Sequence, residues 1–171
     1  MAHSLSEVLA DPAAAARQLA SGVTVYGVRD ATGRLTRYGA AIVEMTLLPL
    51  PALVGDGFPA EDVRVVVLRD ERVLTYVRSG RERAFLHRNP SPSRSLCLFW
   101  DNDDPALRWL PEDGFDEYVT AVRRHLIFEE VWRRDGRWPC EDTPHGPPGQ
   151  DGLPLMTSQM RALRQQWARS A

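Results

Sequence analysis

Cysteine is scarce in this chain. Its 171 residues include only two, Cys97 and Cys140. Two cysteines form no framework of paired disulfides of the kind that stabilises small secreted domains. We therefore expect the thiols to be reduced, as they are in the cytoplasm, and available for chemistry.

Long apolar runs are also missing. No stretch approaches the roughly 18 apolar residues needed to cross a bilayer. The first residues show no basic region followed by an apolar run, so we expect no signal peptide and a cytoplasmic location. The formal net charge of −2 favours neither nucleic acid nor a membrane as a partner.

Two kinds of ligand-binding pattern are absent as well. None of the 12 glycines belongs to a phosphate-binding loop or a dinucleotide-binding pattern. The cysteines and histidines do not have the spacing of a zinc site. We therefore expect the chain to need no cofactor and no metal of its own.

The residues that are present predict an α+β domain. With 43% apolar and 26% charged residues, the chain has the composition and length of one globular domain. Asp11 and Pro12 are typical of a helix N-cap and first turn, which residues 13–20 continue and Gly22 ends. β-Branched and apolar runs predict four strands in an antiparallel meander. The predicted strands are 23–28, 40–48, 63–68 and 73–77, with turns at 30–33 and 69–72 and an irregular loop at 49–59.

The second half of the chain has a different character. Residues 85–113 show little periodicity, and an ordered loop of this length is often functional. C-terminal helices are predicted from Asp113–Gly114 onward and again after Thr157 or Ser158. The first of them has an apolar stripe made of Phe115, Tyr118, Val119, Val122 and Leu126. Its solvent face is predicted to carry Arg123, Arg124, Glu129, Arg133 and Arg134.

The segment around Cys97 is the most informative. It reads Phe85-Leu86-His87-Arg88-Asn89-Pro90-Ser91-Pro92-Ser93-Arg94-Ser95-Leu96-Cys97-Leu98, and Trp109-Leu110-Pro111 follows it. This pattern resembles the active-site segment of ubiquitin-conjugating enzymes, which has a His-Pro-Asn tripeptide, then a nucleophilic cysteine, then Trp-x-Pro before a helix. His87 and Asn89 stand at the family's positions, ten and eight residues before Cys97. Arg88 replaces the family proline.

The resemblance is closest to the prokaryotic branch found in CBASS and related anti-phage operons. That branch has Ser-Leu-Cys-Leu around the nucleophile, as at 95–98 here, and a Trp-Pro…Pro-His-Gly segment after the helix. The matching residues are Trp138, Pro139, Pro144, His145 and Gly146. The resemblance covers about residues 23–146. It implies one UBC-like domain over 1–171, with a core of about 12–146 and a C-terminal extension at 147–171.

The resemblance also implies an activity. Cys97 would form a thioester with the C-terminus of a ubiquitin-like protein or of a cGAS-like nucleotidyltransferase, and would pass that acyl group to an amine of a target protein. A thiolate suits this role because it is both a nucleophile and a good leaving group. A ubiquitin-activating-like enzyme would be the partner that uses ATP.

The resemblance assigns roles to the neighbouring residues. Asn89 is the candidate amide donor to the oxyanion and a brace for the loop. His87 is expected to tie the loop together by hydrogen bonds rather than to act as a base. Asp101 is the candidate to orient or deprotonate the attacking lysine, and Asp103 and Asp104 are equally placed in the sequence. Two further residues are considered: Cys140 is expected to be structural or incidental, and His145 is a further candidate to reach the site.

Two other functions remain open. A catalytically inactive binding module with the UBC fold would scaffold a partner protein, and Arg88 keeps this alternative in play. A cysteine hydrolase is disfavoured, because His87 and Asn89 precede Cys97 on one loop, whereas papain-like enzymes have the histidine far downstream of the cysteine.

Overall fold

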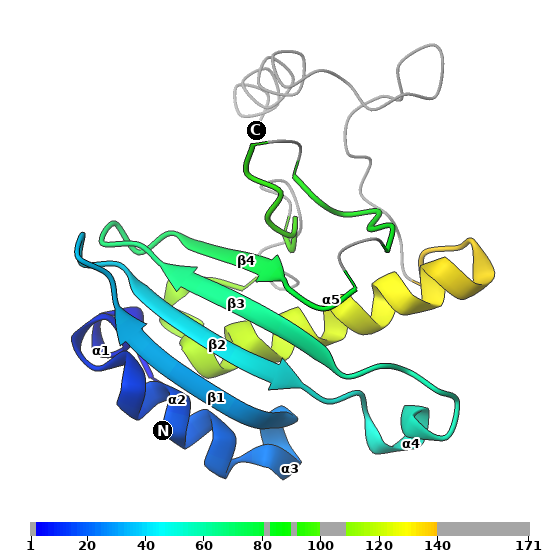
Figure 1. Ribbon diagram of the computed structural model, residues 1–171, viewed down its shortest axis with the longest axis horizontal. Helices are drawn as coiled ribbons and strands as arrows, with labels where there is room; N and C mark the ends of the chain where they lie inside the picture. The colour runs from blue at the N-terminus through cyan, green and yellow to red at the C-terminus, as the bar shows by residue number, and fades with distance from the viewer. Residues whose placement is uncertain (1–2, 81–82, 90–91, 100–108, 140–171) are drawn as a thin grey trace.

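A four-stranded antiparallel sheet organises the molecule (Figure 1). The computed structural model describes residues 3–80, 83–89, 92–99 and 109–139. The strands lie in chain order, and each pairs with the next. They are β1 (Val28–Leu35), β2 (Ala41–Leu47), β3 (Glu61–Val67) and β4 (Val73–Val77). The predicted meander is confirmed.

Helices complete the α+β architecture. Three of them precede the sheet, the longest follows it, and short ones lie in the connections. The predicted irregular loop at 49–59 includes one of these short helices. The helices are α1 (Leu5–Ala10), α2 (Pro12–Ser21), α3 (Val23–Tyr26), α4 (Pro51–Val54), the 3-10 turn η1 (Pro111–Asp113) and α5 (Phe115–Asp135).

Local capping explains the first two helices. The Asp11 carboxylate accepts a hydrogen bond from the Ala14 amide at 2.9 Å, and α2 runs from Pro12 to Ser21 as predicted. The sequence interpretation missed α1, although Ser4 and Glu7 form a capping box at its start. The Ser-x-x-Glu spacing was the available signal.

The start of the sheet differs from the prediction. Residues 23–28 were predicted as a strand from their β-branched content, but 23–26 form α3. Gly27 ends this helix with a positive φ of 69°, and its amide donates to the Val23 carbonyl. The strand then begins at Val28. The left-handed backbone conformation at Gly27, which glycine adopts more readily than other residues, sets the boundary between α3 and β1. The local β propensity of residues 23–26 did not predict it.

The predicted turn at 30–33 is also wrong. These residues lie inside β1, where Gly33 pairs with Val43 of β2. The glycine serves close packing instead of chain reversal. A Cβ atom at Gly33 would lie 1.9 Å from the carbonyl oxygen of Pro12, at the beginning of α2.

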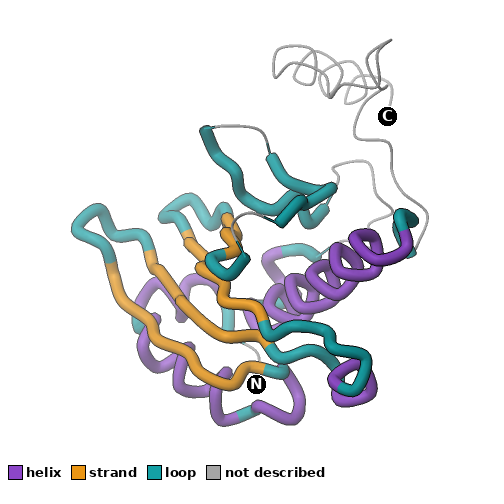
Figure 2. Tube along the Cα trace, turned by 45° about the vertical axis from the view of Figure 1, so that its right-hand side comes forward, coloured by secondary structure: helices purple, strands orange, loops and turns teal. Residues whose placement is uncertain are grey.

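The core lies between one face of the sheet and the helices (Figures 1 and 2). Alternate residues of β2 and β3 point into it, so these strands read buried and then partly or fully exposed along their length. The predicted apolar stripe of α5 packs against them. Its five residues, Phe115, Tyr118, Val119, Val122 and Leu126, are all buried, as predicted.

Of the five charged residues of α5 predicted to form a solvated face, three are not exposed. Glu129 has 0% of its surface exposed. Arg123 donates to the carbonyl oxygens of Leu48 and Pro49, at 2.7 and 2.9 Å. Arg133 and Arg134 likewise donate to loop carbonyls, and of the five only Arg124 and Arg134 are exposed. Long arginine side chains on α5 therefore hold the neighbouring loops against the helix by donating hydrogen bonds to their carbonyl groups.

Some predictions fall outside the described residues. These are the helix after Thr157 or Ser158 and the extension at 147–171. Among the residues that the structure does describe, no helix combines the length and apolar character needed to cross a bilayer.

The close contact at Gly33 yields a stability prediction. Gly33→Ala should lower the free energy of unfolding by about 2 kcal/mol or more, because the added methyl group would clash with the main chain of α2. Gly55→Ala is the matched control. Its Cβ would meet nothing within 4 Å and its φ of −62° suits alanine, so a change within about 0.5 kcal/mol is expected. Urea unfolding measures both, and equal effects would contradict the packing role.

Candidate functional site

The loop around Cys97 folds back on itself. Arg88 and Leu96 form an antiparallel bridge. On one side of it the Cys97 amide donates to the His87 carbonyl at 2.9 Å, and on the other the Asn89 amide donates to the Ser95 carbonyl at 2.8 Å. The ten-residue offset between His87 and Cys97 is therefore the register of a small hairpin. The structure brings these two residues and Asn89 together.

The sheet holds one side of this hairpin. The Leu96 amide donates to the Thr75 carbonyl of β4 at 2.7 Å, and the Leu96 side chain is buried in the core. Figure 2 shows the loop lying beyond the last strand of the sheet. Leu96 thus anchors the residue immediately before the cysteine.

Cys97 itself is partly exposed. The residues on both sides of it are apolar: Leu96 is buried, and Leu98 and Phe99 are partly buried against the core. This packing holds the backbone on both sides of a residue that remains partly exposed. A nucleophile or acyl carrier requires that arrangement, whereas an inert core cysteine does not.

Asn89 braces the loop. Its Nδ2 donates to the Ser95 hydroxyl at 3.0 Å and makes a longer contact of 3.5 Å with the Leu96 carbonyl. Ser95 in turn contacts the Ser93 hydroxyl at 2.8 Å. These contacts describe the bracing role that the resemblance assigns to Asn89. Donation to an oxyanion would need the long, weak contact to be released, and it stays a prediction.

A buried carboxylate holds the other side of the loop. Glu129 of α5 accepts hydrogen bonds from the amides of Leu86 and His87, at 2.9 and 2.8 Å. Its Oε1 also lies 3.5 Å from Nε2 of His125, one helical turn earlier. Two backbone amides and the ring of a neighbouring histidine therefore surround a carboxylate that has no exposed surface.

These contacts shift the Glu129 pKa. Burial raises the pKa of the carboxyl, but hydrogen bonds from His125 and from the two loop amides outweigh burial and hold that pKa below its ordinary value. Glu129 is thus a carboxylate at neutral pH, and its charge strengthens the hydrogen bonds that fix the loop.

His87 is packed among rings. Its side chain is 5% exposed, and its ring centroid lies 4.1 Å from that of Trp138 and 5.8 Å from that of His125. Trp138 belongs to the second motif of the resemblance, so the structure joins the two motifs. This environment suits a histidine that ties the loop to the helix.

Sequence reasoning missed Glu129 and His125 as site residues. A signal for them existed. Both continue the spacing of the apolar stripe, because His125 follows Val122 by three residues and Glu129 follows Leu126 by three. Polar residues on a buried stripe need partners, and here the partners are the loop amides.

Trp109 packs against aromatic residues of the core next to the loop. Its indole N–H donates to the Gly114 carbonyl at 2.7 Å, just before α5. Its ring meets Tyr118 edge-on at 4.9 Å and stacks near Phe99 at 6.4 Å. Tyr118 shares a 2.8 Å hydrogen bond with the Thr75 hydroxyl, and burial raises the pKa of its phenol. This aromatic group packs beneath the chain that follows Cys97.

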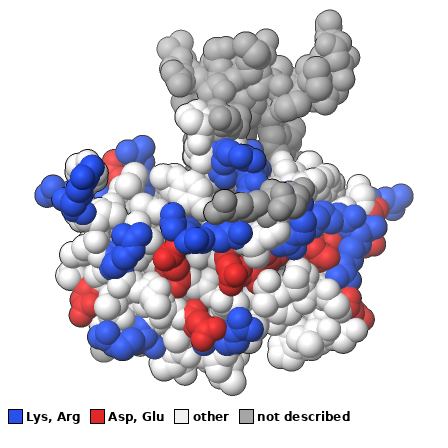
Figure 3. Space-filling view, in the orientation of Figure 1, with Lys and Arg blue, Asp and Glu red and all other residues white. Residues whose placement is uncertain are grey.

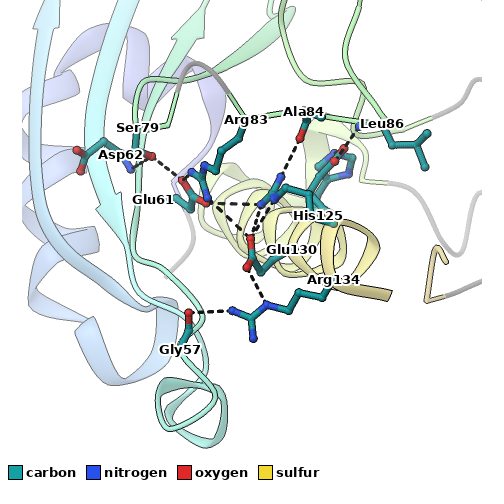
Figure 4. A network of polar contacts seen from close by, with 12 residues as sticks. Gly57, Glu61, Asp62, Ser79, Arg83, Ala84, Leu86, His125, Glu130 and Arg134 are labelled. Atoms are coloured by element: carbon teal, nitrogen blue, oxygen red, sulfur yellow. Dashed lines mark hydrogen bonds and ion pairs between the residues drawn. The ribbon is translucent and has the colours of Figure 1, made fainter. Parts of the chain in front are cut away.

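An ion-pair network supports the start of the loop (Figure 4). Arg83 binds Glu61, which begins β3, and lies 3.9 Å from Glu130 of α5. Arg133 contacts Glu130 at 2.8 Å and donates to the Ala84 carbonyl at 3.1 Å. The network therefore connects the sheet, the helix and the chain that enters the site.

Several predicted residues lie outside the described part of the chain. They are Asp101, Asp103, Asp104, Cys140 and His145, and their roles stay predictions. Within the described ranges, no group of three or more His, Cys, Asp and Glu side chains is placed to hold a metal ion.

Replacing the buried carboxylate tests the loop anchor. Glu129→Gln should lower the free energy of unfolding by about 2–4 kcal/mol, because an amide offers one acceptor oxygen and turns an N–H toward a backbone donor. Glu117→Gln, an exposed change on the same helix, should alter it by less than about 0.5 kcal/mol. Urea unfolding monitored by tryptophan fluorescence gives both values.

The stability difference between the wild type and Glu129→Gln should depend on pH. The folded pKa of Glu129 is depressed, so its stabilising effect is present above the unfolded carboxyl pKa of about 4.3 and is lost as pH falls through the folded pKa. The difference in the free energy of unfolding between the wild type and Glu129→Gln should be constant near neutral pH and should shrink below about pH 4.3. A gap that widens in acid would contradict the anchor.

No protein-family model matches this chain, and searches of curated proteins and of solved structures also returned no match. The likeness to ubiquitin-conjugating enzymes therefore rests on the loop motif and on the order of the helices and strands.

Proposed function

We propose that this protein is an acyl carrier with the UBC-like fold, which holds a partner's C-terminus as a thioester on Cys97. The observation that carries the proposal is the position of Cys97. It is partly exposed, it is paired with His87 through the main chain, and its loop is held by both β4 and α5.

The chemistry proceeds in two transfers. The Cys97 thiolate attacks a thioester on an activating partner, a new carbon–sulfur bond forms, and the partner's thiolate leaves. An amine of the target then attacks the Cys97 thioester, the carbon–nitrogen bond forms, the thiolate leaves, and the amine loses a proton. Each step passes through an oxyanion, for which Asn89, the one side-chain amide in the sequence motif, is the candidate donor.

The departure at Arg88 is compatible with this role. A proline at this position would restrict φ. In this chain the Arg88 backbone instead forms the bridge to Leu96, with a main-chain hydrogen bond on each side. Hydrogen bonding restrains the turn in place of the ring.

The partners follow from the resemblance. They are a ubiquitin-activating-like enzyme, which would use the ATP, and a cargo that is a ubiquitin-like protein or a cGAS-like nucleotidyltransferase. The setting would be cytoplasmic anti-phage defence, and an amine on a protein would be the acceptor.

The alternative is a catalytically inactive binding module with the same fold. The contacts of Asn89 favour it, because both donations from its Nδ2 atom go to the loop itself. Phage protection by Cys97→Ala separates the two functions: an acyl carrier loses protection, whereas a scaffold keeps it.

Loading of the cysteine is the direct test. A synthetic peptide thioester ending in glycine should add to the wild type, and dithiothreitol should remove the adduct. Cys97→Ala should form no such adduct, whereas the matched Cys140→Ala should load like the wild type. Intact-mass spectrometry gives the readout. Loading that depends on Cys140 and not on Cys97 would contradict the assignment.

A further inference from the structure

Four arginines line a cavity beside the loop. The cavity has a volume of about 300 Å³ and is bounded by Arg64 of β3, Tyr76 and Val77 of β4, Arg78, and Arg88 and Arg94 of the loop. Arg64 and Tyr76 are register partners on adjacent strands. In Figure 3, basic side chains gather in a band across the face of the molecule that is drawn.

Charge in this cavity is incompletely balanced. Arg64 and Arg78 both bind Glu44, with Arg64 at 2.7 Å. Arg88 and Arg94 form no ion pair with any described residue. Within the part of the chain that the structure describes, Glu44 is thus the one carboxylate that forms ion pairs with these four arginines, and Arg88 also experiences the charge of the buried Glu129.

Arg88 is the most constrained of the four. Its guanidinium lies over the Phe85 ring at 4.4 Å, and its Nε is buried without a hydrogen-bond partner among the described residues. Burial, and then the neighbouring charge of Arg94, hold the pKa of Arg88 below its ordinary value. An anion in the cavity would relieve the repulsion between the two guanidinium groups.

We infer that this arginine pocket binds a small phosphate-bearing anion. Guanidinium groups match phosphate oxygens with paired hydrogen bonds, and a diphosphate has the several negative charges that the excess of arginine requires. The volume suits a small ligand, at the lower end of the usual range for ligand pockets. Arg94 precedes Cys97 by three residues, although Cys97 is not among the residues that line the pocket.

Pyrophosphate is the probe for this site. Isothermal titration at fixed ionic strength should show saturable binding to the wild type. Arg94→Ala and the double variant Arg88→Ala/Arg94→Ala should bind about tenfold more weakly or worse. Arg17→Ala, an exposed change on α2, is the matched control and should bind like the wild type. Arg94 is exposed, so its single variant remains informative if the double variant does not fold.

Three results would overturn the inference. The first is no saturable binding by the wild type once ionic strength is matched. The second is equal weakening in Arg17→Ala. The third is tighter binding of an acidic peptide than of pyrophosphate, which would assign the pocket to a protein segment. None of these results depends on thioester formation at Cys97.

A second inference comes from the composition of the sequence and does not depend on the arginine pocket. The 171 residues include 21 arginines and no lysine. Arginine supplies positive charge but stays protonated and is not a nucleophile at neutral pH. Lysine, by contrast, is the amine that attacks a thioester.

This difference matters most next to a tethered acyl group. A lysine within reach of the Cys97 thioester would act at a local concentration in the millimolar range, on the order of that of a short tether. Arg94 lies within about 11 Å of Cys97 along the chain. We propose, on the basis of the proposed function, that the absence of lysine protects the thioester from transfer onto the protein itself.

Placing a lysine near the cysteine tests this second proposal. Arg94→Lys and the distant control Arg17→Lys are loaded with the same peptide thioester, in a Cys140→Ser background. The Arg94→Lys adduct should become resistant to dithiothreitol as the acyl group moves from sulfur to nitrogen. The wild-type and Arg17→Lys adducts should stay cleavable. Tandem mass spectrometry should locate the new amide at residue 94.

The outcomes separate the two proposals. If the wild type never loads, the proposed function fails. If it loads but Arg94→Lys stays as cleavable as the wild type, the protective role is overturned while the acyl carrier stands. Conversion of the wild-type adduct into a resistant form within the chain would also overturn the protective role.

Discussion

The carboxylate of Glu129 is the contact on which the candidate site depends. A charge without exposed surface would cost several kcal/mol if it were left alone. Here two loop amides and one histidine surround it. The two amides lie 43 and 42 residues before Glu129 in the sequence, so their hydrogen bonds form only when the loop and α5 are packed together. The same interaction that compensates the buried charge gives an otherwise irregular loop its place.

The loop is fixed from two directions, and this explains its geometry. Leu96 joins it to the edge of the sheet, and Glu129 joins it to the helix. Between these anchors a small hairpin sets His87 opposite Cys97. Support behind a partly exposed cysteine suits the acyl transfer proposed for Cys97, because a carrier must present its sulfur to large partners without unfolding.

The arginines of this molecule fall into two groups that differ in what their guanidinium groups contact. On α5, Arg123 and Arg134 donate to main-chain carbonyls and hold connections against the helix. Around the cavity beside the loop, Arg88 and Arg94 have no carboxylate partner among the described residues. The first group is satisfied by the fold, whereas the second has donors left for a ligand. A chain without lysine obtains both kinds of contact from guanidinium groups, which do not attack esters.

Local signals in the sequence determined much of this fold. The caps of α2, the β-branched runs of β2 to β4 and the apolar stripe of α5 were predicted correctly, because each depends on neighbours within a few residues. The loop motif was visible in the same way. Only the tertiary structure decided that Gly33 belongs to a strand that α2 crosses, that Glu129 is buried, and that Asn89 braces Ser95. Contacts between distant segments settle these positions, since a residue's local pattern does not say which backbone will pack against it.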